Sequence, residues 1–73
     1  MEQALFPEIP IRSPRQLGQA LARMRRLRGS TQVGVAQASG VRQPTISSVE
    51  SGAPGTELAT VFAILAALDL ELV

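Results

Sequence analysis

Hydrophobic side chains recur at helical spacing in four separate segments of this chain. From Ser13 to about Arg28, leucine, alanine and methionine fall three or four residues apart and predict one buried stripe. Residues 32–39 and 43–51 each place about one apolar side chain per turn on the sides that face each other. Residues 57–67 are apolar nearly all round, and the other short helices cannot cover them completely. The pattern predicts an all-α domain of four to five helices, with an apolar face left for a partner.

Cap and turn residues mark where these helices begin and end. Ser13 offers a side-chain acceptor at a helix start, and Pro14 follows where its missing N–H does no harm. Gly40 supplies a turn between the second and third helices, because glycine adopts a positive φ at the lowest cost. Thr56 is expected to cap the fourth helix. The helices should therefore be short and linked by tight turns.

The two ends of the chain differ from its middle. Residues 1–12 contain Pro7 and Pro10, which predict an extended N-terminal arm, or a partly disordered tail or leader, before a domain spanning 13–73. Residues 68–73 alternate apolar and polar, as in a half-buried strand, which needs the same strand of a second chain or the arm as its pairing partner. We expect a homodimer whose interface includes Val61, Phe62, Leu65, Leu68, Leu70 and Leu72.

The composition argues against catalysis. The 73 residues include no cysteine and no histidine, and Asp69 is the one aspartate, which removes thiol nucleophiles, imidazole bases and most zinc ligands. We therefore predict a protein that is not an enzyme and has no cofactor or metal site. A chain this short buries only roughly 60% of its unfolded surface, so a partner chain would help it. Without a signal peptide or a run long enough to cross a bilayer, the expected location is the cytoplasm.

Charge is distributed unevenly along the sequence. Residues 12–52 carry seven arginines against Glu50 alone, a net +6, whereas the first eleven residues carry −2 and the last twenty-one carry −3. Every positive side chain is an arginine, whose planar fork suits phosphate or guanine. The alternative is that the arginines from Arg23 to Arg28 are only solvated charges at the end of a helix, with no binding role. A basic middle beside a polar helix favours contact with a polyanion.

Residues 30–52 have the pattern of a helix-turn-helix unit. Two short helices joined at Gly40, the second of them polar on its outer face, are typical of proteins that place this second helix in the major groove of DNA. Its side chains can hydrogen-bond to base edges and phosphates. The expected DNA contacts are Arg42, Gln43, Thr45, Ser47 and Ser48.

The motif resembles a known family over about residues 13–68. Counting from Gln32, a small residue is fifth, glycine is ninth, and apolar residues are fourth, tenth, fifteenth and eighteenth. With Thr31-Gln32, Ile46-Ser47 and Glu50-Ser51-Gly52, the sequence resembles the lambda-repressor-like (Cro/Xre) family. The segments S-P-R-Q-L, R-Q-P-T-I-S-S-V-E and F-A-I-L-A-A-L-D-L-E-L are most similar to HipB-type antitoxins. Ser39, in place of an apolar residue, and Gly34 within a helix depart from the family pattern.

The resemblance implies a fold, partners and further residue roles. HipB-type proteins are homodimers that join their C-terminal strands, bind an inverted-repeat operator in their own promoter and hold a HipA-type kinase toxin. It also implies that Gln32 packs beside Gln43 and bonds a phosphate. Glu50 would repel DNA, so we expect it to turn inward and pair with Arg25, as an arginine–glutamate pair does in this family. The alternatives are a stand-alone Xre-type phage or chromosomal regulator, or a protein-interaction module without DNA binding.

Overall fold

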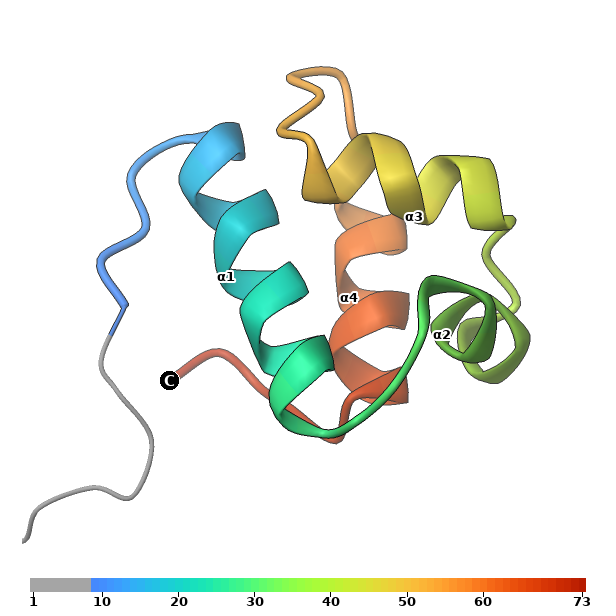
Figure 1. Cartoon of the computed structure of the whole chain (residues 1–73). Coiled ribbons are helices and arrows are strands. Elements are labelled where there is room, and N and C mark those ends of the chain that lie inside the picture. Colours follow the sequence, from blue (N-terminus) through green and yellow to red (C-terminus); the bar gives the residue numbers. More distant parts are fainter. Residues whose placement is uncertain (1–8) are drawn as a thin grey trace, which may run out of the picture.

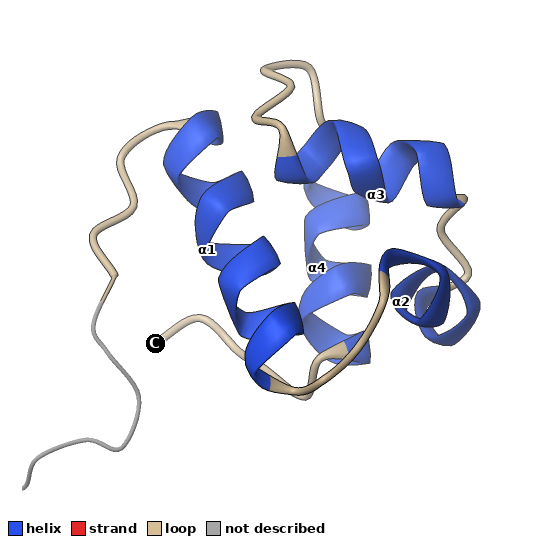
Figure 2. Ribbon diagram, in the orientation of Figure 1, coloured by secondary structure: helices blue, strands red, loops and turns tan. Residues whose placement is uncertain are grey.

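The computed structural model describes residues 9–73, which fold into helices joined by short loops. The helices are α1 (Pro14–Leu27), α2 (Gln32–Ser39), α3 (Gln43–Glu50) and α4 (Leu58–Ala67) (Figure 1). Figure 2 shows helices and loops but no strand in this part of the chain, so the predicted all-α class is confirmed. No helix within residues 9–73 has the length and apolar character needed to cross a membrane.

The arrangement separates the helix-turn-helix unit from the ends of the chain. In Figure 1, α2 and α3 lie together on one side of the molecule, while residues 9–12 and the C-terminal tail lie on the other side of α1. Most of the predicted N-terminal arm, residues 1–8, lies outside the described residues. The part that is described, residues 9–12, forms neither helix nor strand. The division into an arm and a domain over 13–73 stays a prediction.

Helix α1 begins and ends as its sequence predicts. The Ser13 hydroxyl accepts a hydrogen bond from the Gln16 N–H at 3.0 Å, and Pro14 occupies the first helical position. At the other end Gly29 has φ +70°, and the Ser30 N–H donates to the Arg25 carbonyl oxygen at 3.0 Å. This left-handed termination satisfies carbonyl groups that the helix leaves free.

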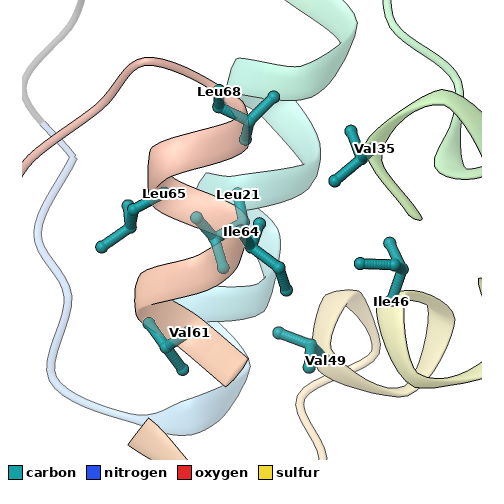
Figure 3. Close-up of a cluster of buried hydrophobic side chains, with 8 residues drawn as sticks. All are labelled: Leu21, Val35, Ile46, Val49, Val61, Ile64, Leu65 and Leu68. Atoms are coloured by element: carbon teal, nitrogen blue, oxygen red, sulfur yellow. The ribbon is translucent and has the colours of Figure 1, made fainter. Parts of the chain in front are cut away.

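One apolar core joins all the helices. Ile46 of α3 is fully buried, and Leu21, Val35 and Leu65 are each no more than 5% exposed (Figure 3). The cluster consists of Leu21, Val35, Ile46, Val49, Val61, Ile64, Leu65 and Leu68. Because α2 and α3 contribute Val35, Ile46 and Val49, the core holds the helix-turn-helix unit against α1 and α4.

Helices α1 and α3 approach closely at Gly18. A Cβ atom placed on Gly18 would lie 2.2 Å from the Val49 carbonyl oxygen and 2.8 Å from the Glu50 carbonyl oxygen. Both distances are too short for any real side chain, so only glycine permits this packing. The absence of a side chain at this position thereby sets the distance of α3 from α1.

The predicted cap of α4 is wrong. Glu57, not Thr56, occupies the N-cap position, and its side chain makes no capping hydrogen bond. The Thr56 hydroxyl instead donates to the Ala53 carbonyl oxygen at 3.0 Å and closes the loop before the helix. Because the loop already uses this hydroxyl, α4 begins one residue later than a Thr56 cap would place it.

The predicted C-terminal strand cannot begin at Leu68. Leu68 is 1% exposed and ends α4, and Asp69 adopts φ +57°. The Leu70 N–H donates to the Leu65 carbonyl oxygen at 2.8 Å, which is the same left-handed termination that Gly29 makes after α1. A strand therefore has room only from Leu70 onward. In the single chain, residues 70–73 have no regular structure, and strand pairing across a homodimer stays a prediction.

Candidate nucleic-acid interface

Polar side chains stabilise the turn between α2 and α3. Gly40 has φ +75°, as the turn requires. The Ser39 hydroxyl donates to the Ala36 carbonyl oxygen at 3.4 Å and accepts from the Val41 N–H at 3.1 Å. Ser39 departs from the family pattern, but its hydroxyl ties the end of α2 to Val41 in the turn that leads to α3.

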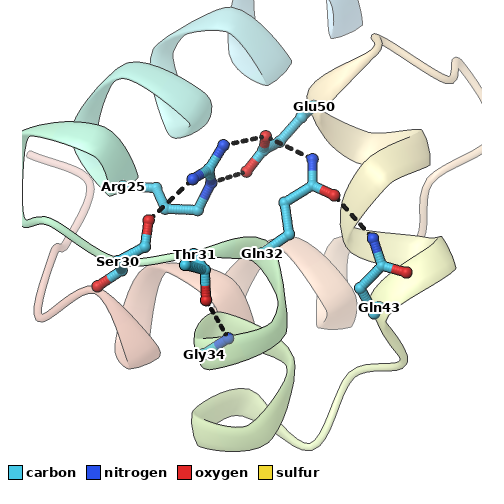
Figure 4. A network of polar contacts seen from close by, with 7 residues as sticks. All are labelled: Arg25, Ser30, Thr31, Gln32, Gly34, Gln43 and Glu50. Atoms are coloured by element: carbon cyan, nitrogen blue, oxygen red, sulfur yellow. Dashed lines mark hydrogen bonds and ion pairs between the residues drawn. The ribbon is translucent and has the colours of Figure 1, made fainter.

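The side chain of Thr31 caps the N-terminus of helix α2. The Thr31 hydroxyl accepts a hydrogen bond from the Gly34 N–H at 2.9 Å (Figure 4). This cap fixes the first turn of α2 despite the glycine within it. Both departures from the family pattern are therefore accommodated by local hydrogen bonds.

Helix α3 has a buried face and an exposed face. Ile46 and Val49 point into the core at 0% and 3% exposure. On the other side Gln43 and Thr45 are exposed, and Ser47 is half-buried. Arg42 and Ser48 are also exposed. These predicted contact residues thus lie just before α3 or within it, and most of them are exposed; their contact with DNA stays a prediction.

An ion pair between Arg25 and Glu50 joins α1 to α3. Arg25 Nε donates to Glu50 Oε2 at 2.7 Å, and Arg25 Nη2 donates to Glu50 Oε1 at 3.0 Å. Their side chains are only 11% and 9% exposed. Arg25 Nη1 also donates to the Ser30 carbonyl oxygen at 2.8 Å (Figure 4). The pair that the sequence predicts is present, and through Ser30 it also holds the loop that leads into α2.

Two amides extend this ion pair toward the exposed face of α3. Gln32 Nε2 donates to Glu50 Oε1 at 3.0 Å, and Gln43 Nε2 donates to Gln32 Oε1 at 2.8 Å. Figure 4 shows the resulting chain of side chains from Arg25 to Gln43. The family resemblance implied that Gln32 packs beside Gln43 but gave no indication of the bond to Glu50. The described part of the chain leaves no buried side-chain nitrogen or oxygen without a partner.

The electrostatics of the network favour the charged form of both partners. Burial raises the pKa of the Glu50 carboxyl, but hydrogen bonds from Arg25 and Gln32 and the charges of Arg25 and Arg26 outweigh it, so this pKa lies below its ordinary value of 4.5. The hydrogen bond to Glu50 raises the pKa of Arg25. At neutral pH Glu50 is therefore a carboxylate, which accepts hydrogen bonds and donates none.

The residues predicted to form the dimer interface divide into two groups. Val61, Leu65 and Leu68 are at most 5% exposed and belong to the core of their own chain. Phe62 is 52% exposed and Leu72 is 60% exposed, while Leu70 is half-buried. Leu58, which the prediction did not include, is 72% exposed. It lies one turn before Phe62 on the same face of α4. Leu58 and Phe62 are therefore the large apolar side chains that α4 offers to a second chain.

Comparison with known proteins places the chain in a family. A family model described as a helix-turn-helix domain matches residues 16–73. Antitoxin HipB of Escherichia coli O6:H1 is 40% identical over 62 residues, which make up 85% of this chain and 66% of that protein. Antitoxin HipB of Escherichia coli (strain K12) is also 40% identical over 62 residues, covering 85% of this chain and 70% of that protein.

The fold comparison agrees with the sequence comparison. A chain of the solved HipA-HipB-O2-O3 complex superimposes with a TM-score of 0.82 at 39% identity, covering 88% of this chain and 90% of the matched chain. The resemblance drawn from the helix-turn-helix motif is thus confirmed. The chain belongs to the helix-turn-helix domain family and, within it, to the HipB antitoxins.

Proposed function

We propose that this protein is a sequence-specific DNA-binding repressor and the antitoxin of a HipA-like kinase toxin-antitoxin system, which represses its own operon from the cytoplasm. The observation that carries the proposal is the exposed start of α3, where Gln43 is held by a hydrogen-bonded chain anchored on the Arg25–Glu50 pair. A side chain that is both exposed and fixed suits the reading of base edges. The HipA-HipB-O2-O3 complex, which holds a relative of the same fold, supports both the DNA and the toxin as partners.

Each polar group of the unit has a role in this proposal. Gln43 reads an adenine edge, and Arg42 contacts guanine or phosphate. Gln32 has one N–H left after its bond to Glu50, and this N–H is free to reach a phosphate. The hydroxyls of α3 complete the contacts: Thr45, Ser47 and Ser48.

The DNA target follows from the proposed dimer. Two copies related by a twofold axis place their α3 helices in successive major grooves roughly 34–36 Å apart, so the operator is an inverted repeat. The exposed apolar pair Leu58 and Phe62, together with a strand beginning at Leu70, forms the interface. The protein acts by binding and not by catalysis.

Binding to duplex DNA from the region upstream of its own gene tests the proposal. Arg42→Ala is expected to lower the salt dependence of binding by about one unit of slope, or to change the base preference. Arg12→Ala removes an exposed arginine that precedes α1 and should leave the base preference unchanged. Undetectable or salt-independent DNA binding by the wild-type protein would instead favour a protein-interaction module.

The antitoxin role needs a separate experiment. Co-expression with a HipA-like kinase encoded beside this gene should yield a complex that co-purifies and that still binds the duplex. If no such gene lies nearby and the protein nevertheless represses transcription, it is a stand-alone regulator.

A further inference from the structure

We propose that Glu50 selects the base that Gln43 reads, because the acceptor-only carboxylate fixes the orientation of the two amides between itself and the DNA. Glu50 would be a positioning residue, acting through Gln32. The inference rests on the proposed function, in that α3 must read DNA. It adds a specificity role for a side chain that is only 9% exposed and would itself touch no base.

The Glu50 carboxylate fixes the orientation of the Gln32 amide. Both carboxylate oxygens of Glu50 accept hydrogen bonds from Arg25, and Oε1 also accepts one from Gln32 Nε2 at 3.0 Å. If the Gln32 amide were turned over, its own oxygen would face the carboxylate oxygen with no proton between them. An ionised carboxylate therefore forces Gln32 to direct one N–H of its amide toward Glu50, which leaves its Oε1 facing Gln43.

The orientation of Gln32 in turn fixes that of Gln43. The outward Oε1 of Gln32 can only accept, and Gln43 Nε2 donates to it at 2.8 Å. A reversed Gln43 amide would again oppose two oxygens. The orientation of Gln43 therefore follows from the charge of Glu50, two side chains away.

The orientation of Gln43 determines which hydrogen-bond donor and acceptor it presents to DNA. With one N–H bound to Gln32, Gln43 keeps Oε1 as an acceptor and its second N–H as a donor. One acceptor and one donor match adenine, which offers its N6 amino group and N7. They do not match guanine, whose O6 and N7 are both acceptors. A reversed amide would keep Oε1 for Gln32 and present only N–H groups outward, which suits guanine. The carboxylate at position 50 thus favours adenine.

The test compares base preference among variants on one set of duplexes. Duplexes selected by the wild-type protein from a randomised library are compared with matched duplexes in which the selected A·T pair is replaced by G·C. A good bidentate contact discriminates by roughly 5- to 150-fold. Glu50→Gln replaces an acceptor-only group with an amide that also donates. It should reduce the adenine preference by about tenfold, within that range.

Two further variants separate positioning from stability. Arg25→Lys weakens the ion pair but leaves the carboxylate, so it should lower the melting temperature and keep the adenine preference. Gln32→Ala breaks the chain of amides without touching the ion pair. It should reduce the preference as Glu50→Gln does, and the double variant should lose no more than either single variant. If Glu50→Gln does not fold, an adenine preference retained by Gln32→Ala still overturns the positioning role, because Glu50 reaches Gln43 only through Gln32.

The outcomes distinguish this inference from the proposed function. If Gln43→Ala abolishes the adenine preference while either folded Glu50→Gln or Gln32→Ala retains it, the positioning role of Glu50 is wrong and the DNA-binding role stands. If the wild-type protein selects no duplex, or Gln43→Ala leaves the preference intact, the assignment of Gln43 as the reading residue fails, and the positioning role fails with it.

Discussion

Removing one member of the Arg25–Glu50 pair should destabilise the domain more than replacing both. Arg25→Met takes away the donors at 2.7 Å and 3.0 Å and leaves a carboxylate that is 9% exposed without its ion-pair partner. Breaking a buried pair in this way costs about 3 to 5 kcal/mol. A domain of 73 residues has a free energy of unfolding of roughly 4 to 11 kcal/mol, so one substitution should remove a large part of it.

Replacing both residues by apolar side chains is expected to cost less. Arg25→Met combined with Glu50→Leu leaves no unpaired charge, and such replacements of buried pairs are often close to neutral. The Ser30 carbonyl and the Gln32 amide each lose a partner, at about 1 kcal/mol per bond. The double variant should therefore be more stable than Arg25→Met by on the order of 1 to 3 kcal/mol.

Urea unfolding at one fixed protein concentration measures these differences, because dimerisation makes stability depend on concentration. The matched control is Asp69→Asn, which removes an ion pair whose atoms Arg28 Nη2 and Asp69 Oδ2 lie 3.8 Å apart at 44% and 94% side-chain exposure. Asparagine tolerates the positive φ of this position, so the control should leave stability unchanged within error. The reasoning from burial is refuted if Arg25→Met is no more harmful than Asp69→Asn, or if the double variant is as unstable as the sum of its single substitutions.

Three other measurements follow from the same structure. The unfolded chain takes up the Glu50 proton at higher pH than the folded chain does, because the pKa of Glu50 is lowered on folding. The stabilisation by Glu50 is therefore complete at neutral pH and is lost as the pH falls below 4.5 toward the lowered pKa. Urea unfolding at stepped pH should show this loss of stability, and the Glu50→Gln variant should not show it. Gly18→Ala should cost about 1 to 3 kcal/mol by thermal unfolding, because its Cβ would lie 2.2 Å from the Val49 carbonyl oxygen, whereas Gly55→Ala meets nothing within 4 Å and should be neutral. Phe62→Glu should shift the protein from dimer to monomer in sedimentation equilibrium while its helical circular dichroism spectrum persists, and a dimer of unchanged affinity would exclude this face of α4 from the interface.

The sequence predicted the helices well because their termini carry strong local signals. The Ser13-Pro14 start and the positive-φ glycines at positions 29 and 40 act through backbone geometry that neighbouring residues determine. Thr56 misled the prediction, because its hydroxyl can cap a helix or close a loop and only the path of the loop decides. The C-terminal tail misled the prediction too, because Asp69, which follows α4, adopts the left-handed conformation that glycine usually provides.

The Arg25–Glu50 pair and the contact between Gln32 and Gln43 were predicted, but the bond from Gln32 to Glu50 that joins them was not. Charge alone indicated that Glu50 turns inward, because an acid on a DNA-facing surface would repel the phosphates. The bond from Gln32 to Glu50 joins residues eighteen positions apart on different helices. No spacing rule for one helix covers such a contact, since it depends on how α2 packs against α3.

Helix α4 links the core to the proposed dimer because it has two apolar faces. Val61 and Ile64 pack in the same cluster as Ile46 of α3, whereas Leu58 and Phe62 are exposed on another face. A helix of ten residues has no separate segment for each task, so both faces move as one body. The separation of two reading helices in a dimer would then be set by how α4 packs inside each chain. For this reason a conservative core change at Ile64 should alter the tolerated spacing between half-sites as well as stability, which connects the hydrophobic pattern of the sequence directly to DNA recognition.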